Sequence, residues 1–295
     1  MSSRRIALTG ATGFLGSHLL ETLMGTDSDV AVLIHQTPIL DEAVLSGVSV
    51  VRTGLPDWQE RLLEFDPDCV IHTATRFQVS HDRRDISPMI RANVEFGTEL
   101  LQISAETGAR LVTFSSFWQR YEGRSQAPMN LYAATKQAFD DVADYFRDDG
   151  LDLTRLTLFD VYGPGDTRVK LVPLLVRAAL SGDPLEASSG NQLIDLTYVD
   201  DVVEAVLQIA LESDAAGEGD FVVRSGALPL RNVASTLSEV VGRPVPVVWG
   251  ARPDRPREMR QDWEMGTLLP GWSPRVSLSE GLSRVWTEVQ NEGSV

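Results

Sequence analysis

The amino-acid sequence predicts an α/β fold built on a doubly wound parallel sheet. Through the first half of the chain, short apolar runs of strand type alternate with amphipathic segments of helical period, which is the pattern of consecutive βαβ units. The first apolar run, Ile6–Leu8, leads through a glycine-rich turn into a helical pattern that reaches Leu23. No internal repeat or low-complexity tract interrupts the alternation, which favours one continuous sheet.

The first turn reads Gly10-Ala11-Thr12-Gly13-Phe14-Leu15-Gly16. Gly10 allows a sharp turn, Gly13 lets backbone N–H groups approach a pyrophosphate, and Gly16 lets the helix pack closely on the strand. The first N–H groups of a helix have no internal partner and attract phosphate. The turn therefore predicts a dinucleotide site formed by Gly10, Thr12, Gly13, Phe14, Leu15 and Gly16. The alternative is a strand–helix turn with a structural role only.

Composition narrows the classes of ligand. The chain has 295 residues, more than one compact core usually needs, and a formal net charge of −16 without a basic run, which argues against nucleic acid. Its single cysteine, Cys69, excludes an intramolecular disulfide, and with four histidines it leaves no cluster for a metal. Arg4 and Arg5 precede only a short apolar run, so neither a signal peptide nor a membrane span is expected. We therefore expect a cytoplasmic protein.

The end of the second strand, Val30–Ile34, bears on the choice of cofactor. An acidic residue about 20 positions after the glycines normally binds the ribose 2′-hydroxyl of NAD. This chain has His35-Gln36-Thr37 there, and no acid until Asp41. Since no carboxylate would repel a 2′-phosphate, NADP(H) is expected over NAD, with His35 as a candidate contact. The alternative is that His35 lies in solvent at the end of the strand.

Further strands are expected at Val48–Val51, Cys69–Ala74 and Arg110–Ser116, and helices at Trp58–Phe65 and Ile86–Thr107. Ligands of an open parallel sheet bind at the carboxyl ends of its strands. The hydroxyl of Ser116 is expected at that edge. Asn93 lies in the middle of the second of these helices, where an asparagine is usually solvated.

A tyrosine and a lysine share one face of the next helix. Tyr132 and Lys136 are four residues apart, which is close to one helical turn. A phenol has a pKa near 10, but a neighbouring ammonium group and an oxidised nicotinamide both lower that pKa. The pair can then act as a general acid/base on a carbonyl or alcohol, with the hydroxyl of Ser116 holding the same oxygen. In isolation such a pair is more often a surface feature, but its place behind a dinucleotide turn favours catalysis.

Nearly the whole chain resembles the extended short-chain dehydrogenase/reductases, the NAD-dependent epimerase/dehydratase family of nucleotide-sugar epimerases, dehydratases and ketoreductases. The resemblance rests on Thr9–Gly16, His72-Thr73-Ala74, Asn93, Ser116, Tyr132-x-x-x-Lys136, Val161–Gly165, Gly190–Gln192 and Asp195–Val203. It implies a Rossmann-like sheet and a catalytic trio of Ser116, Tyr132 and Lys136, with Ser115 as the alternative serine. It also adds Thr73, Ala74 and Asn93 to the cofactor contacts, together with Tyr132 and Lys136.

Departures from the family pattern refine the expected reaction. The 4,6-dehydratases of this family carry Thr-Asp-Glu at the end of the fifth strand, and their carboxyl groups take part in eliminating water. Here Ser116 is followed by Phe117-Trp118, which cannot transfer protons, so dehydration is disfavoured. Asp160 stands where the pattern has Asn. The segment Gln192–Leu196 lacks the arginine that typically holds a substrate pyrophosphate, so either the substrate is not a diphosphonucleotide or another arginine replaces it.

Basic residues that could replace the missing pyrophosphate-binding arginine lie in two places. Some follow the Gly163-Pro164-Gly165 turn, and others lie in the arginine-rich stretch 252–260. The segments 255–259 and 269–282 resemble the C-terminal lobe of NDP-4-keto-6-deoxyhexose 4-ketoreductases of deoxysugar pathways. The candidate substrate contacts are Phe77, Phe117, Trp118, Asp160, Arg168, Lys170 and Arg257. The alternatives are a solvated loop around Arg257 and a hydrogen bond from Asp160 to the backbone only.

Residues 1–162 are expected to form an NAD(P)-binding domain, to which 195–213 returns, and 163–194 with 214–295 a substrate-binding lobe. A crevice at the carboxyl edge of the sheet would hold both ligands. The resemblance also allows a homodimer, since the helix that carries Tyr132 often helps to pair subunits in this family.

The sequence thus predicts NADPH-dependent reduction of a keto group, at C4, of a nucleotide-linked deoxysugar. In this reaction Tyr132 would protonate the carbonyl oxygen, Lys136 would hold the nicotinamide ribose and lower the phenol pKa, and Ser116 would position the carbonyl. The nearest alternative is a nucleotide-sugar 4-epimerase with tightly held NAD. A more distant one is a non-catalytic, cofactor-sensing regulator, a class that commonly lacks the Tyr–Lys pair.

Overall fold

The computed structural model describes residues 3–35, 46–211, 218–263 and 266–292. The chain forms two compact units. Unit 1 consists of Met1–Leu158, Val203–Val222 and Met265–Gly271, and unit 2 of Phe159–Val202, Val223–Glu264 and Trp272–Val295.

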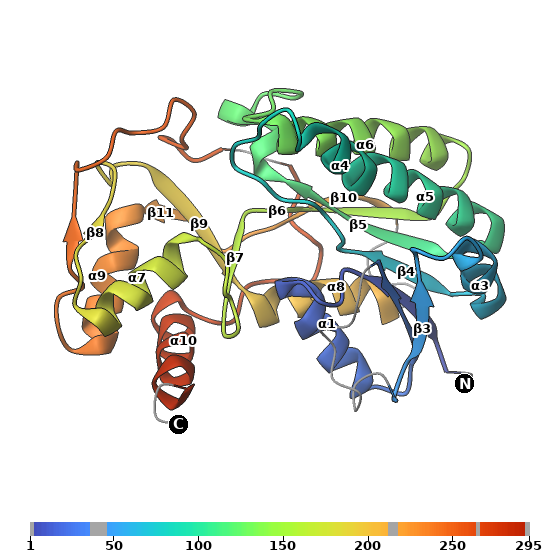
Figure 1. Cartoon of the computed structure of the whole chain (residues 1–295), viewed down its shortest axis with the longest axis horizontal. Coiled ribbons are helices and arrows are strands. Elements are labelled where there is room, and N and C mark those ends of the chain that lie inside the picture. The colour runs from blue at the N-terminus through green and yellow to red at the C-terminus, as the bar shows by residue number, and fades with distance from the viewer. Residues whose placement is uncertain (1–2, 36–45, 212–217, 264–265, 293–295) are drawn as a thin grey trace. The chain divides into compact units, whose positions relative to one another are not determined.

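Unit 1 is built on a seven-stranded sheet with the strand order β10-β6-β5-β4-β1-β2-β3 (Figure 1). Its strands are β1 (Arg5–Thr9), β2 (Asp29–Ile34), β3 (Ser49–Arg52), β4 (Cys69–His72), β5 (Arg110–Ser116), β6 (Leu153–Leu158) and β10 (Gly219–Val223). From β6 to β3, every pair of neighbouring strands is parallel. The predicted α/β fold with a parallel sheet is confirmed.

Helices cover both faces of this sheet, as the doubly wound pattern requires. They are α1 (Phe14–Met24), α3 (Trp58–Phe65), α4 (Ile86–Ile90), α5 (Phe96–Thr107), α6 (Leu131–Asp148) and α8 (Val199–Leu211), of which α8 belongs to unit 1 from Val203 onward. Figure 1 shows α5 and α6 on one face and α1 and α8 on the other. Two short 3₁₀ turns, η2 (Phe117–Gln119) and η3 (Tyr121–Gly123), follow β5.

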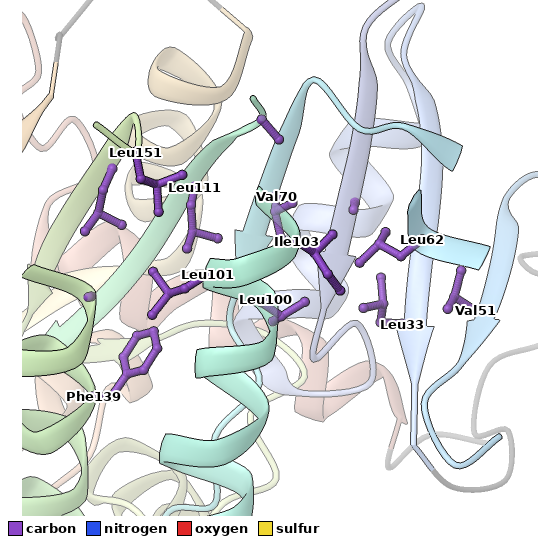
Figure 2. Close-up of a cluster of buried hydrophobic side chains, with 14 of the residues drawn as sticks. Leu33, Val51, Leu62, Val70, Leu100, Leu101, Ile103, Leu111, Phe139 and Leu151 are labelled. Atoms are coloured by element: carbon purple, nitrogen blue, oxygen red, sulfur yellow. The ribbon is translucent and has the colours of Figure 1, made fainter. Parts of the chain in front are cut away.

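A large apolar cluster fills the core on the first of these faces. Leu111 lies near Leu101 of α5 and Phe139 of α6, and Val70 lies near Ile103 of α5 (Figure 2). Leu33 lies farther along the sheet, near Leu62 of α3. Helices α5 and α6 approach each other closely, because a Cβ on Gly97 would lie 2.4 Å from the Phe139 ring. Cys69 on β4, in the middle of the sheet, is fully buried. Burial of this apolar surface on two sides explains why the strand segments are continuously hydrophobic.

The helix predicted over Ile86–Thr107 is interrupted by a wider turn. Between α4 and α5, residues Arg91–Glu95 form a π-helical turn, η1. The extra residue of a π turn changes which side chains face inward. Asn93 is consequently buried, with 2% exposed, so the expectation that it is solvated was wrong.

In its described residues, unit 2 contains two small sheets, three complete helices and the beginning of α8. The sheets have the orders β11-β9-β7 and β12-β8. The elements are β7 (Asp160–Tyr162), α7 (Leu171–Ser181), β8 (Leu185–Glu186), β9 (Leu193–Tyr198), β11 (Ala227–Pro229), α9 (Leu230–Val241), β12 (Val247–Val248) and α10 (Leu278–Glu292).

The acidic residues of the motif Asp195–Val203 hold unit 2 together. Asp195 is buried and pairs with Arg224, 2.7 Å from its Nε. Asp201 accepts hydrogen bonds from the amides of Arg275 and Val276, both at 3.1 Å. This motif is therefore structural within the unit.

The boundaries of the two units differ from the predicted domains in four places. Residues 159–162, which include β7, were expected in the cofactor domain but belong to unit 2. Residues 218–222, which include most of β10, were expected in the lobe but belong to unit 1. Residues 195–202 were expected in the cofactor domain, but β9 pairs with β7 in unit 2. Residues 265–271 were expected in the lobe, but they belong to unit 1. The physical reason is that Val222 of β10 exchanges backbone hydrogen bonds with Thr267 and Leu269.

Candidate cofactor and catalytic site

The turn between β1 and α1 has room only for glycine at two positions. Gly10 has a φ of +71°, a conformation that favours glycine. A Cβ on Gly16 would lie 2.0 Å from the Gly10 carbonyl oxygen. The amide of Gly13 donates to the same oxygen at 2.8 Å and closes the turn. The sequence thus brings the start of α1 close against the end of β1.

The beginning of α1 is arranged to receive an anion. Its N-cap, Gly13, provides no side-chain cap, and its first turn holds no acidic residue. The first helical hydrogen bond runs from the Ser17 amide to the Gly13 carbonyl at 2.8 Å, so the amides of Leu15 and Gly16 precede it. Thr12 and Gly13 are exposed. These residues fit the pyrophosphate of a dinucleotide, since they offer backbone donors at the positive end of a helix.

The segment after β4 is fixed against the glycine turn. The hydroxyl of Thr73 donates to the Thr9 carbonyl at 2.6 Å, and the amide of Ala74 donates to Thr9 Oγ1 at 3.1 Å. A Cβ on Gly10 would lie 2.5 Å from Thr73 Oγ1. Thr73 and Ala74, both predicted cofactor contacts, therefore lie next to the turn.

His72, at the end of β4, is a buried structural residue. Its Nδ1 lies 2.9 Å from Thr9 Oγ1, and its ring packs edge-on against the rings of Phe96 and Phe139. Burial lowers the pKa of His72 to about 3, and the charge of Lys136 acts in the same direction. The imidazole is neutral at physiological pH.

His35 is exposed at the end of β2, with Nδ1 3.2 Å from Thr53 Oγ1. Gln36, Thr37 and Asp41, on which the choice of cofactor was based, lie outside the described residues. The preference for a 2′-phosphate stays a prediction.

Tyr132 and Lys136 are both buried on the inner face of α6, with 9% and 5% of their surfaces exposed. The helix begins at the N-cap Asn130, whose Oδ1 accepts from the Ala133 amide at 2.9 Å. Burial lowers the pKa of Lys136, and the charge of Arg155 lowers it further, whereas Asp140 raises it. The two predicted catalytic residues thus share a site of low dielectric constant.

The two serines at the end of β5 have different partners. Ser115 Oγ donates to the carboxylate of Asp140 at 2.6 Å. Ser116 Oγ accepts from the Trp118 amide at 3.3 Å. In the described part of the chain, the Ser116 hydroxyl donates to no other group. Its proton is available to a ligand, whereas that of Ser115 is already used.

Aromatic rings surround Tyr132. The Phe77 ring lies 5.0 Å from it between centroids, and the Trp118 ring lies 6.4 Å from it. Phe77 and Trp118 also contact each other, with centroids 5.5 Å apart, and Phe117 packs against Trp118 at 6.1 Å. The predicted substrate contacts of unit 1 therefore gather at the predicted catalytic phenol.

Two asparagines hold the loop that carries Phe77. Asn93 accepts from the amide of Arg76 and the hydroxyl of Thr75, and it donates to the Arg76 carbonyl and to Thr135 Oγ1. Asn130 Nδ2 lies 3.0 Å from the Val79 carbonyl oxygen, to which it donates. The predicted cofactor contact Asn93 thus uses both amide hydrogens and its oxygen within the chain, which indicates a positioning role.

In unit 2, two basic candidates are already paired with carboxylates. Lys170 Nζ lies 3.0 Å from Asp160 Oδ1. Arg168 binds both carboxylate oxygens of Asp166, with Nε at 2.6 Å and Nη2 at 2.8 Å. Arg257 is exposed. Asp160 therefore takes part in an ion pair, and a substrate contact of its carboxylate stays a prediction.

Sequence reasoning missed the polar network behind β5, formed by Gln119, Asp140 and Arg155. Gln119 and Asp140 are buried and joined by a hydrogen bond of 2.6 Å, and Arg155 is buried beside Asp140. The sequence indicates one member of this network. Asp140 lies four residues after Lys136 and therefore on the same face of the helix.

Within residues 3–35, 46–211, 218–263 and 266–292, no helix is long and apolar enough to cross a membrane. In the same ranges, no group of three or more His, Cys, Asp or Glu side chains is placed to hold a metal ion.

Known proteins share this architecture. MoeE5, in complex with UDP-glucuronic acid and NAD, is 26% identical with a TM-score of 0.81, covering 98% of this chain and 99% of that one. The UDP-glucose 4-epimerase of Thermus thermophilus, in complex with NAD, is 28% identical with a TM-score of 0.80, covering 99% of this chain and 100% of that one.

Among characterised proteins, CDP-abequose synthase of Salmonella muenchen is 25% identical over 291 residues, which cover 96% of this chain and 97% of that protein. The model of the NAD dependent epimerase/dehydratase family matches residues 6–223. The chain, with its nicotinamide-dinucleotide turn and Tyr–Lys helix, belongs to the NAD dependent epimerase/dehydratase family, whose members act on nucleotide sugars.

Proposed function

We propose that this chain is an NADPH-dependent reductase of a keto group, at C4, in a nucleotide-linked deoxysugar. The observation that carries the proposal is the composition of the site around Tyr132. The phenol lies beside Lys136 on a buried helix face, and its neighbours Phe77 and Trp118 are aromatic. Residues 116–119 read Ser-Phe-Trp-Gln, without a carboxylate that could assist elimination of water. Such a site suits protonation of a carbonyl oxygen.

Each residue of the trio has a distinct role in this proposal. Tyr132 donates its phenolic proton to the carbonyl oxygen, and the ammonium group of Lys136 stabilises the phenolate that remains. The hydroxyl of Ser116 donates a hydrogen bond to the same oxygen. Phe77 and Trp118 keep water from the phenol, which strengthens its interaction with Lys136. A reduced nicotinamide supplies the hydride when it is bound.

The cofactor would be held by the glycine turn and by the segment that packs on it. The residues concerned are Gly10, Thr12, Gly13, Phe14, Leu15, Gly16, Thr73 and Ala74. NADPH is preferred in the proposal because the sequence has no acid at the end of β2 where NAD would need one.

A nucleoside diphosphate sugar is proposed as the substrate class. CDP-abequose synthase is named for a CDP-linked sugar, and MoeE5 was solved with a UDP-linked one. In unit 2, the exposed Arg257 is proposed as a phosphate ligand, together with Arg168 and Lys170, which also pair with carboxylates of their own unit. The homodimer is retained as part of the proposal and is tested by light scattering on the purified protein.

The second candidate is a nucleotide-sugar 4-epimerase that uses NAD. Two similar proteins, MoeE5 and the Thermus thermophilus epimerase, were solved with NAD. An epimerase would use the same trio with a nucleotide that remains bound through turnover.

Thermal unfolding with NADP, NADPH, NAD and NADH in turn separates the two candidates. A ligand that binds the folded state raises the midpoint temperature by mass action. The reductase predicts a rise with NADP and NADPH and loss of NADPH absorbance when a CDP-, dTDP- or UDP-linked 4-keto-6-deoxyhexose is added. A rise with NAD alone, or NAD released from the purified protein on denaturation, supports the epimerase and contradicts the reductase.

A further inference from the structure

Asp140 lies on the same face of α6 as the predicted catalytic pair, one turn beyond Lys136 and two turns beyond Tyr132. Its carboxylate is buried. Oδ2 accepts hydrogen bonds from Ser115 Oγ and from Gln119 Nε2, both at 2.6 Å. The carboxylate is thus held by two donors from the segment that ends β5 and follows it.

Gln119 extends this contact to the predicted catalytic serine. Its Oε1 accepts from the backbone amide of Ser116 at 2.6 Å. The hydroxyl of Ser116 in turn caps the η2 turn by accepting from Trp118. One side chain therefore joins the Asp140 carboxylate to the peptide group that presents the Ser116 hydroxyl.

The same carboxylate lies near two buried cations. Arg155 on β6 places Nε 3.4 Å from Asp140 Oδ1, and its Nη2 donates to the Asp140 carbonyl at 3.0 Å. Lys136 is the second cation, and the Asp140 charge raises the pKa of Lys136 against the effect of burial.

Two further carboxylates and one imidazole belong to the surroundings of this network. Arg155 also binds Asp144 of α6 at 2.6 Å and Asp220 of β10 at 3.0 Å. From β4, His72 faces Lys136 as a neutral ring, since burial lowers the pKa of His72 to about 3. Among the described residues of unit 1, Asp140 is the buried carboxylate. Burial raises the pKa of Asp140, and the charges of Arg155 and Lys136 act against that rise, so its carboxylate can balance the charge of Lys136.

We propose that Asp140 is a positioning residue of the reaction: its charge keeps Lys136 protonated beside Tyr132, and its hydrogen bond to Gln119 fixes the main chain that presents Ser116. The inference rests on the proposed function in so far as it assigns Tyr132 the role of proton donor. Both halves depend on contacts within unit 1.

The charge half of the proposal, in which the Asp140 carboxylate keeps Lys136 protonated, predicts the direction in which a pKa changes. Removing a negative charge makes proton release easier for both Lys136 and Tyr132, so the apparent pKa of the coupled pair falls. Reduction needs the protonated phenol. The alkaline limb of the kcat/KM profile must therefore move to lower pH, whereas a purely structural defect lowers the whole profile without moving the limb.

Asp140→Asn is the decisive variant, because it keeps the shape and one acceptor oxygen for Ser115 and Gln119 while removing the charge. Asp144→Asn is the matched control. It removes a carboxylate from the same Arg155, but one turn farther along α6, where the side chain is 50% exposed. We expect the limb to move down by about half a pH unit or more in Asp140→Asn, to stay in place in Asp144→Asn, and to return in Asp140→Glu.

A second measurement does not depend on turnover. With ¹³Cζ-labelled tyrosine in the NADPH-bound protein, the Tyr132 resonance is identified by its loss in Tyr132→Phe and titrated by NMR. A lower phenol pKa in Asp140→Asn supports the inference even if no keto sugar is reduced, in which case only the proposed function fails. An unchanged phenol pKa overturns the charge half.

The positioning half of the proposal is that the hydrogen bond from Gln119 to Asp140 fixes the main chain at Ser116. It is tested by Gln119→Met, which removes both hydrogen bonds of Gln119 and leaves the Asp140 charge. This variant also serves if Asp140→Asn does not fold. We expect kcat to fall about tenfold with the alkaline limb unmoved. A kcat equal to that of the parent protein overturns this half.

Discussion

The Phe77 ring meets the Tyr132 ring edge-on, with centroids 5.0 Å apart and planes at 79°. Because Phe77 is 39% exposed, its removal should cost little stability. Phe77→Ala should lower kcat/KM about 5- to 10-fold, as expected for loss of an aromatic pair worth about 1 kcal/mol. Val79→Ala, in the same loop and similarly exposed, is the control. Equal kinetics for the two variants would show that the ring has no special part in the site.

Tyr132→Phe should lower the reductase turnover by about 10²- to 10⁴-fold, the range typical of general acid catalysis. The ring contacts with Phe77 and Trp118 do not need the hydroxyl, so the variant should keep the fold, as a cooperative thermal unfolding transition would show. Tyr145→Phe, at an exposed position of the same helix, should leave both measurements as they are. Near-normal turnover of Tyr132→Phe would remove this residue from the mechanism.

Gly16→Ala should abolish the rise in melting temperature that the cofactor causes. The added Cβ would lie 2.0 Å from the Gly10 carbonyl oxygen, a contact that the backbone must move to relieve. Gly13→Ala is milder, because its Cβ would lie 3.2 Å from the same oxygen. Thermal unfolding with and without NADPH compares the two variants. The steric account of the turn is contradicted if Gly16→Ala retains the full shift.

The buried imidazole of His72 should make the protein sensitive to acid. Its folded-state pKa of about 3 lies below the ordinary value near 6.5, so the unfolded chain binds a proton that the folded chain does not. The stabilising effect is complete above pH 6.5 and is lost as pH falls toward 3, by about 2 kcal/mol between pH 7 and pH 5.

Urea denaturation of the parent protein and of His72→Asn at pH 7 and pH 5 measures this effect. Carboxylates titrate in both proteins, so their contribution cancels in the comparison. The free energy of unfolding should fall less steeply in His72→Asn, and equal slopes would refute the assignment to His72.

The sequence predicts the sheet well because each strand is a buried apolar run whose type does not depend on distant partners. The turn at Gly10 and Gly16 was predictable for a similar reason, since its requirements are local. The burial of Asn93 could not be predicted in this way. It follows from the π turn at Arg91–Glu95, which changes the direction of the side chains, and the spacing of apolar residues in the sequence does not indicate such a turn.

The candidate site was predicted only where its residues share one helix or one strand end. Tyr132 and Lys136 have a fixed spacing, but the network of Gln119 and Asp140 joins a turn to a helix, and no pattern in one segment reveals it. The ion pair of Arg168 could have been predicted from the sequence, because an acidic residue lies close to it in the chain. Asp166 stands two residues earlier and neutralises it.

The thiol of Cys69 can report when the central strands of the sheet separate. It is the chain's single thiol, it lies on β4 between β1 and β5, and burial raises its pKa to about 12. A thiol reagent reacts with exposed thiolate, so fraying at the edges of the sheet should leave it untouched. The labelling rate under native conditions would then time the rare events that part the central strands, without any introduced probe.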